Sequence, residues 1–135
     1  MLPNLDKFVK KLHILTIATM GDELKCANSF YAYDTLNSAL IIAGSSSSEH
    51  IKSALKNSKV AGTIFRNTKI VTKIKGLQFE GIFRLANEKE KKIYFSRYPF
   101  AKAIKPEIFT IEIEYAKFTN NKLKFAHKEI WKKES

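Results

Sequence analysis

Apolar side chains recur at every second position over much of the chain, a spacing typical of β-strands with one buried face. The clearest example is the segment 109–115, where Phe, Ile, Ile and Tyr alternate with Thr, Glu and Glu. Gly21-Asp22 and Asn120-Asn121 are expected turns, because these residues tolerate the backbone angles that turns need. The pattern predicts further strands at 13–20, 24–34, 36–43, 60–65 and 70–86, and a last strand or tail at 123–131.

Short helices are predicted between the strands, where apolar residues recur every three or four positions. Asn87 and Glu90 have capping-box spacing at the start of one helix, and Pro99 ends that helix. The helices cover 4–11, a segment from Ser47 or Ser48 to about 57, and 88–98, with one more helical turn at 100–104. We therefore expect residues 1–135 to form one domain, a small β-barrel of six or seven antiparallel strands with three or four short peripheral helices.

Two strands carry additional information. In the second strand, Cys26 and Asn28 share a face with Leu24 and Phe30. The apolar character of this face predicts that Cys26 is a core residue and that Asn28 needs a polar partner. In the fifth strand the apolar positions change from even to odd numbers at Gly76, which predicts a bulge or a sharp bend there.

A serine-rich segment between a strand and a helix is the strongest candidate for a binding site. The apolar run 40–43 ends in a glycine and four serines, and Ser46 and Glu49 have capping-box spacing. Such a strand–helix junction presents N–H groups, hydroxyls and the positive end of a helix dipole to one point, where phosphate groups bind. His50 and Lys52 would add positive charge, whereas Glu49 would repel an anion. The alternative interpretation is a solvated linker with an ordinary helix cap.

The net charge limits the kinds of partner but identifies none. It is +11, from 24 basic and 13 acidic residues, which suits nucleic acid, anionic membrane or phosphate-bearing ligands. The lysines are spread over the whole chain, however, and this is typical of a solvated surface. The five Tyr and ten Phe residues could stack nucleic-acid bases, but most of them alternate with polar residues in strand register and are expected in the core.

The remaining chemistry favours a cytoplasmic protein without a metal site. The single cysteine excludes an internal disulfide and suits a reducing compartment. No apolar run has the length of a membrane span, and we expect no export signal. The three histidines lack metal-ligand spacing, and there is no nucleophile elbow, P-loop or dinucleotide-binding fingerprint. An enzyme built on this chain would therefore depend on a cofactor.

Six short motifs, in this order, carry a resemblance to a known family: CANSFY at 26–31, VAGT at 60–63, KGLQFEG at 75–81, RYP at 97–99, KFTN at 117–120 and KEIW at 128–131. The chain resembles the FMN-binding split-barrel family, whose best-known members are the pyridoxamine 5′-phosphate oxidases. Its poorly characterised YhbP-like branch is the closer match. The likeness runs nearly from end to end and implies a homodimer of split β-barrels with FMN at the interface.

The resemblance also implies which residues hold the cofactor. The phosphate positions of the family fall on Ser48 and His50, with Ser46 and Lys52 close by. The flavin ring would lie beside Asn28, Ser29 and Gln78, and a partner subunit would contribute Lys128 and Trp131, although simple packing explains Trp131 equally well. Many relatives hold the phosphate with a basic residue that 34–43 lacks, and Lys75 is a candidate replacement.

The same resemblance limits the activity. The Arg-Leu-x-Pro ending that holds the vitamin phosphate in true pyridoxamine-phosphate oxidases is absent, so vitamin B6 oxidation is not expected. The hypothesis is an FMN-dependent oxidoreductase that takes electrons from a reduced nicotinamide or a small organic substrate. No catalytic residue is assigned. The alternatives are a haem-binding or non-catalytic split barrel and, third, a basic nucleic-acid-binding barrel.

Overall fold

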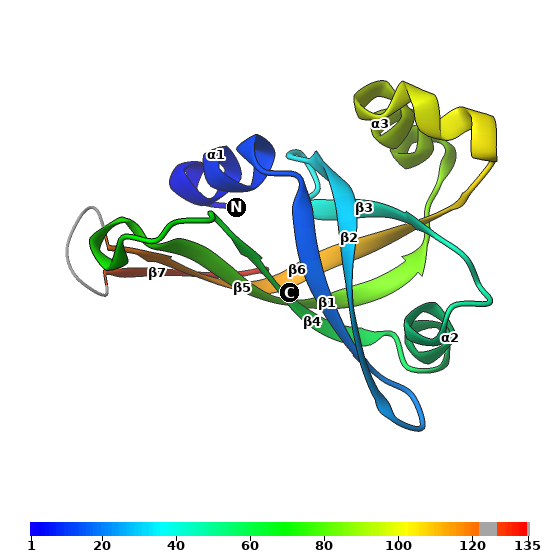
Figure 1. The fold of residues 1–135 in the computed structure, drawn as a ribbon, viewed down its shortest axis with the longest axis horizontal. Coiled ribbons are helices and arrows are strands. Elements are labelled where there is room, and N and C mark those ends of the chain that lie inside the picture. Colours follow the sequence, from blue (N-terminus) through cyan, green and yellow to red (C-terminus); the bar gives the residue numbers. More distant parts are fainter. Residues whose placement is uncertain (122–126, 135) are drawn as a thin grey trace.

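The computed structural model describes residues 1–121 and 127–134, which form a β-barrel with helices at its ends and on one side (Figure 1). The elements in order are α1 (Pro3–Lys11), β1 (Ile14–Met20), β2 (Leu24–Asp34), β3 (Ala39–Gly44), α2 (Glu49–Lys56), β4 (Lys59–Phe65), the 3₁₀ helix η1 (Val71–Lys73), β5 (Lys75–Leu85), α3 (Glu88–Arg97), the 3₁₀ helix η2 (Pro99–Ile104), β6 (Glu107–Asn120) and β7 (Lys128–Lys132). None of the described helices is long and apolar enough to cross a membrane.

The barrel closes because β3, the first strand in the sheet order, also pairs with β6. The sheet order is β3-β2-β1-β4-β5-β6-β7, and β3 also pairs with β6, so six strands form a ring and β7 pairs with the second half of β6. Every pairing is antiparallel. The predicted small antiparallel barrel with short helices is therefore confirmed.

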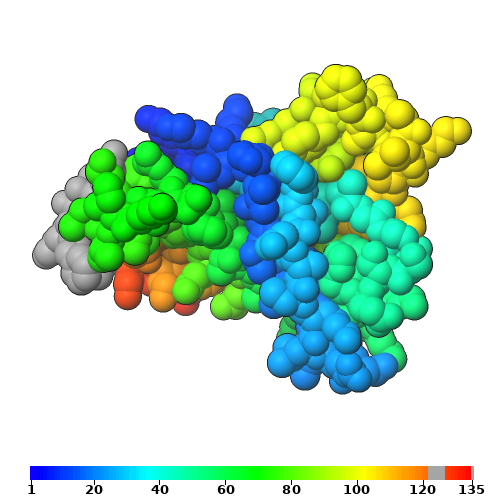
Figure 2. All heavy atoms as spheres, in the orientation of Figure 1, coloured from blue at the N-terminus to red at the C-terminus, as the bar shows by residue number. Residues whose placement is uncertain are grey.

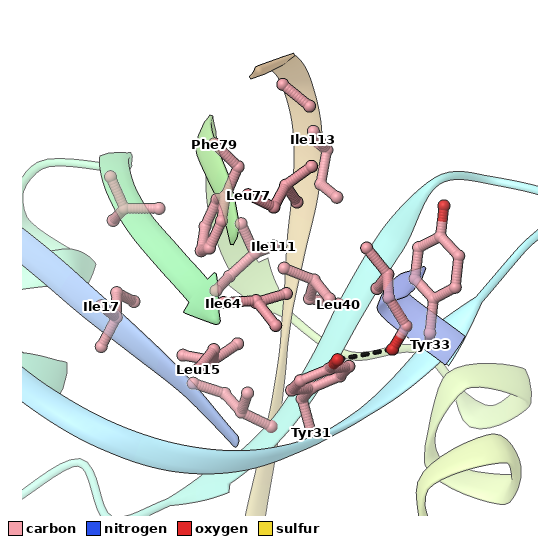
Figure 3. Packing of buried hydrophobic residues seen from close by; sticks show 14 of the residues in the cluster. Leu15, Ile17, Tyr31, Tyr33, Leu40, Ile64, Leu77, Phe79, Ile111 and Ile113 are labelled. Atoms are coloured by element: carbon pink, nitrogen blue, oxygen red, sulfur yellow. Dashed lines mark hydrogen bonds between the residues drawn. The ribbon is translucent and has the colours of Figure 1, made fainter. Parts of the chain in front are cut away.

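The barrel interior is filled by side chains from all six strands. Figure 3 shows Leu15 and Ile17 of β1, Tyr31 of β2 and Phe79 of β5 pointing toward one another, and all four are at most 1% exposed. Burial of such side chains is the main favourable contribution to folding. The strands alternate inward and outward residues, so the same alternation decides which side chains face out of the barrel.

Two helices close the ends of the barrel. The Tyr31 hydroxyl donates to the Val9 carbonyl, drawn as a dashed line in Figure 3, and holds α1 beside the start of β1. At the other end of β1, the Gly21 N–H donates to the Ser53 hydroxyl of α2 at 2.9 Å. A side chain at Gly21 would collide with Ser53, since a Cβ there lies 2.8 Å from the Ser53 oxygen. The turn and α2 thus require a glycine at this point.

The third helix covers part of the outer face of the barrel. Tyr94 of α3 packs on Ala32 of β2, Ile41 of β3 and Ile108 of β6, which form a second, smaller core. The predicted capping box is present: the Glu90 N–H donates to the Asn87 side chain, and the Glu90 carboxylate accepts from the Asn87 N–H.

The rest of the outer face of β1 and β2 is left uncovered. Leu24 is 73% exposed and Phe30 53% exposed, and Cys26 between them is exposed as well. The prediction that Cys26 is a core residue is therefore wrong. The alternate residues of β2, such as Tyr31 and Tyr33, fill the barrel instead, so the apolar face of Cys26 points outward.

Two strand predictions also need correction. The fifth strand begins at Lys75 and not at Ile70, because 70–74 is an exposed segment that contains η1. The apolar positions change phase near Gly76 because 70–74 is not part of the strand. The register shift between β5 and β6 lies between Glu80 and Gly81, and not at Gly76 as predicted. The third strand begins at Ala39 rather than 36, because Asp34 accepts hydrogen bonds from the N–H groups of the two residues after Thr35 and forms a turn. Part of the predicted segment 123–131 lies outside the described residues; β7 covers its end.

Candidate functional site

The serine loop, residues 45–48, connects β3 to α2 and contains two of the predicted phosphate ligands, Ser46 and Ser48. Ser48 is the N-cap residue of α2, but its side chain makes no capping hydrogen bond. The predicted capping box of Ser46 and Glu49 does not form. The Ser46 N–H and hydroxyl both donate to Glu107 Oε1, at 2.9 and 2.8 Å. The serine loop is therefore shaped around a carboxylate of the chain itself.

This carboxylate occupies the position in which the loop would hold an anion. The two hydrogen bonds from Ser46 lower the pKa of Glu107, so Glu107 is ionised at neutral pH. An incoming phosphate would meet a negative charge and would have to displace it. Ser46 can serve as a phosphate ligand only when the Glu107 side chain turns away, and it is exposed and has room to do so.

The other predicted phosphate ligands supply little positive charge. Burial lowers the pKa of His50, which keeps its imidazole neutral at pH 7. The Lys52 ammonium lies 3.9 Å from the Glu49 carboxylate. The Ser48 hydroxyl has no hydrogen-bond partner among the described residues, whereas the Ser45 and Ser47 hydroxyls bond to each other at 2.7 Å.

A trough of small side chains runs over the outer face of β1, β2, β4 and β5. It contains a cavity of about 430 Å³ lined in part by Thr16, Ala18, Cys26, Ala61, Thr63 and Gln78. A second cavity of about 470 Å³ shares Ala18 and Ala61 with the first and continues toward Met20 and Leu24. Small residues leave room for a flat ligand or another chain to approach the sheet closely.

Polar side chains form a row across this trough. The strand registers place Asn28 opposite Thr16, Thr16 opposite Thr63, and Thr63 opposite Gln78. The Thr16 hydroxyl donates to Asn28 Oδ1 at 2.8 Å, so the partner predicted for Asn28 exists. Three strand spacings separate Asn28 from Gln78, or about 14 Å. Two of the three predicted flavin contacts therefore lie on one face, at the two ends of a polar row.

The third predicted contact points elsewhere. Ser29 is half-buried, its hydroxyl donates to the Phe30 carbonyl at 3.1 Å, and strand alternation turns it to the side of Ala27 and Tyr31. Within one chain, Ser29 therefore does not share the face of Asn28.

Lys75 lies far from the serine loop. It pairs with Asn120 at the end of β6, whereas Ser46 binds Glu107 at the start of that strand. A strand of this length spans about 44 Å, so one chain cannot bring Lys75 to the serine loop. The replacement role predicted for Lys75 is not available within a single chain.

The two residues expected from a partner subunit lie on β7 and differ in burial. Trp131 pairs with Ala116, is partly buried and packs against the main core. The packing role foreseen for Trp131 is thus present in the single chain. Lys128 pairs with Thr119 and is exposed, so its ammonium is accessible from outside.

The trough also contains residues that the sequence did not single out, chiefly Thr16, Ala18, Ala61 and Thr63. A signal for them existed. In β1 the residues between the large apolar positions are threonine and alanine, and the same is true of β4. Small side chains that alternate with core residues on adjacent strands indicate a sheet face that a ligand or another chain can approach closely.

Four of the six phenylalanine rings on the described strands are buried, whereas Phe30 and Phe65 are 53% and 65% exposed. Phe79, Phe83, Phe109 and Phe118 are each at most 3% exposed. The expectation that these rings belong to the core is confirmed, and they are not available to stack nucleic-acid bases.

Comparison with known proteins places the chain in a family. No family model matches it. A UPF0306 protein of Campylobacter jejuni is 38% identical over 130 residues, which cover 94% of this chain and 96% of the relative. The UPF0306 protein YhbP of Salmonella schwarzengrund is 33% identical over 134 residues, covering 96% and 91%.

Solved structures with low sequence identity share the fold. A heme binding protein from Mycobacterium smegmatis superposes with a TM-score of 0.79 at 9% identity, over 94% of this chain and 55% of that longer chain. A FAD-binding protein from Mesorhizobium loti gives a TM-score of 0.70 at 13% identity, covering 86% and 92%. A protein of the pyridoxinephosphate oxidase family from Clostridium acetobutylicum gives 0.70 at 12% identity, covering 96% and 92%.

The structural likenesses agree with the barrel topology. Identity below 15% supports the fold alone. With full-length relatives at 33% and 38% identity, the chain belongs to the UPF0306 family, the YhbP-like branch, and folds as a split β-barrel of the pyridoxamine-phosphate-oxidase type.

Proposed function

We propose that this UPF0306 protein is a flavin-binding oxidoreductase that holds FMN on the trough of β1, β2, β4 and β5, in a site completed by a second copy of the chain. The observation that carries the proposal is the polar row from Asn28 to Gln78 across a floor of small side chains. The chain leaves this floor uncovered although apolar residues border it.

The residues of the trough fit a flavin ring. Alanine side chains at Ala18 and Ala61 allow a flat ring to approach the sheet, and Asn28, Thr16 and Gln78 offer amide and hydroxyl groups to its polar edge. FMN, when bound, supplies reversible two-electron transfer, with a reduced nicotinamide or a small organic substrate as donor. The protein side chains orient the ring and exclude water. We assign none of them a proton-transfer role.

The fit to the phosphate is weaker, and this can be tested directly. The Ser48 hydroxyl is available to bind the phosphate, whereas the Ser46 N–H and hydroxyl already donate to Glu107. Glu107→Gln removes the competing charge and should raise FMN affinity at least threefold. Ser48→Ala should lower it by a similar factor, and Ser47→Ala is the matched control because Ser47 bonds only within the loop. An unchanged affinity in both Glu107→Gln and Ser48→Ala would place the phosphate elsewhere.

A second copy of the chain is the proposed cover of the trough. Leu24, Met20 and Ile14 are each at least 45% exposed along the β1–β2 hairpin, whose tip projects at the lower edge of the molecule in Figure 2. The same face carries both a basic residue, Lys59, and an acidic residue, Glu80. Two copies can therefore bring opposite charges together when these faces meet. In such a dimer, we propose that the exposed Lys128 contacts the site of the neighbouring copy.

The first experiment is a titration of the purified protein with FMN, followed by flavin fluorescence and absorbance. We expect saturable binding with a stoichiometry of one FMN per chain. Asn28→Ala should weaken it at least fivefold, whereas Asn67→Ala, in the exposed loop after β4, should not. Protein that purifies colourless and changes no flavin signal would overturn the proposal.

A haem is the second candidate, because a thiol is available in the same trough. Cys26 is exposed there, and thiolates ligate haem iron in known proteins. The similarity to the heme binding protein from Mycobacterium smegmatis points in the same direction. Haem titration would produce a Soret band that Cys26→Ser abolishes, together with no response to FMN. A Soret band unaffected by Cys26→Ser would remove the thiol from this candidate.

A further inference from the structure

A cationic cavity lies at the α1 end of the barrel, away from the trough. It has a volume of about 360 Å³ and lies between α1 and the ends of β4, β5 and β6. We name it the α1 cavity. Its basic residues are Lys7 and Lys11 of α1, Arg66 at the end of β4 and Lys75 at the start of β5. No carboxylate lines it in the part of the chain that the structure describes.

The backbone brings these cations together from two directions. In α1, Asn4, Lys7 and Lys11 are spaced by three and four residues, so they share one face of the helix. In the barrel, the inward alternation of β4 and β5 continues to Arg66 and Lys75. The Arg66 N–H donates to the Lys75 carbonyl at 3.1 Å, which fixes these two residues side by side.

Such a grouping of like charges destabilises the empty cavity. Lys7 and Lys11 are four residues apart on a helix, and like charges at this spacing repel each other. Lys7, Lys11 and Arg66 form no ion pair within the described residues. The Glu129 carboxylate accepts a hydrogen bond from Asn4 at 3.0 Å and lies 3.7 Å from His127. A bound anion would remove the repulsion.

The floor of the α1 cavity is apolar and aromatic. Phe8, Leu12 and Phe118 form it, and the rings of Phe8 and Phe118 lie 4.8 Å apart between centroids. The amides of Asn4 and Asn120 stand beside the cations. A cavity with an aromatic floor, a cationic rim and amide groups matches a ring that carries a phosphate, because a phosphate ester holds nearly two negative charges and binds Arg in a bidentate manner.

We propose that the α1 cavity is a second ligand site, which binds a small aromatic compound bearing a phosphate group, of the size of a nucleoside monophosphate. The ring packs against Phe8 and Phe118, and the phosphate contacts Lys11, Arg66 and Lys75. This site opens from the inward-facing side of β4 and β5, whereas the flavin trough lies on their outward-facing side. The two sites can therefore be tested separately.

The test is calorimetric titration of the purified protein with AMP, adenosine and inorganic phosphate at low salt. AMP should bind at least tenfold more tightly than either adenosine or phosphate. Arg66→Gln and Lys11→Gln should each weaken AMP at least tenfold. The matched control is Lys10→Gln, the adjacent residue of α1, which lines a different cavity between α1 and α3 and should leave AMP affinity within twofold.

Several results would overturn the proposal. AMP that fails to bind at millimolar concentration would do so, as would phosphate that binds as well as AMP. An equal loss in Lys10→Gln and Lys11→Gln would indicate unspecific attraction by charge, and a loss in Lys10→Gln alone would place AMP between α1 and α3. FMN titration of Arg66→Gln should match that of the unchanged protein, because Arg66 does not line the trough. AMP binding is measured without FMN, so failure of the flavin proposal does not affect this one. Melting temperatures establish that each variant is folded.

Discussion

The outer face of β2 passes through two regions that differ in what covers them. Near the end of the strand, Ala32 is 1% exposed beneath α3, whereas Leu24 at its beginning is 73% exposed. Both side chains lie on the same face of the same strand and both are apolar. The covered region forms a second core with residues of the chain, and the uncovered region offers an equivalent surface to something outside it.

The covered region is maintained by a network that joins α3 to the barrel. Arg84 of β5 donates to both oxygens of Glu90 at 2.8 Å and to Glu112 of β6 at 3.1 Å. At the other end of α3, Arg97 donates to the Leu12 carbonyl at 2.7 Å and Tyr98 to the Tyr31 carbonyl at 2.5 Å. Nothing comparable holds the uncovered region of the described chain, where the side chains of Thr16 and Asn28 bond only to each other. The difference indicates that α3 is part of the fold, and that a cover of the trough, as proposed above, would come from outside the described residues.

The largest expected effect tests the covered region. Ile41→Ala removes a fully buried side chain from the core between α3 and the barrel, and it should lower the free energy of unfolding by about 2–5 kcal/mol. Denaturant unfolding followed by circular dichroism measures this change. Leu24→Ala, in the uncovered region, is the control and should stay within about 0.5 kcal/mol for the isolated chain. Equal losses would mean that the two regions do not differ.

A smaller effect, dependent on pH, tests the network that fixes α3. Burial acts to raise the pKa of Glu90, but hydrogen bonds from Arg84 and from the Asn87 N–H, with the charge of Arg84, outweigh it and lower the pKa. Glu90→Gln keeps the capping-box geometry and removes the charge, so it should cost about 1.5–3 kcal/mol at pH 7.

The sign of the pH dependence follows from the lowered pKa of Glu90. The stability that the ionised carboxylate contributes is present above its unfolded pKa, about 4.3, and is lost as the pH falls through the lower folded value. The gap between the unchanged protein and Glu90→Gln should therefore begin to narrow below about pH 4 and close as the pH falls through the folded pKa of Glu90. A gap that stays constant down to about pH 3 would show that the charge does not matter.

The features that could be predicted from the sequence are those decided by neighbouring residues. The alternation of apolar and polar residues predicted the bounds of β2, and the spacing of Asn87 and Glu90 predicted a capping box. Both features depend on contacts within a few positions of the chain. Ser46 with Glu49 has the same spacing, yet Ser46 bonds to Glu107, 61 residues away. A local rule cannot foresee a competitor that the pairing of β3 with β6 brings to the loop.

The position of Cys26 was missed for a related physical reason. Alternation separates the two faces of a strand but does not say which face the barrel interior will use, since both faces of β2 are rich in apolar residues. The face that points into the barrel is the one with Tyr31 and Tyr33. These side chains are large enough to fill the interior, and their hydroxyls donate hydrogen bonds to α1. An apolar face reserved for a ligand or a second copy has the same sequence pattern as a core face.

The smallest expected change in stability tests the uncovered region. Leu24→Ser replaces an apolar side chain that is 73% exposed, so unfolding of the isolated chain should change by no more than about 0.5 kcal/mol. If a second copy covers this surface, the same substitution should weaken the dimer at least tenfold, or by about 1.4 kcal/mol, measured by sedimentation as a function of concentration. Leu36→Ser is the matched control, because Leu36 is 86% exposed in the turn between β2 and β3, outside the trough. A chain that sediments as a monomer at every concentration, or a dimer weakened equally by both substitutions, would show that the uncovered region serves a ligand or partner of another kind.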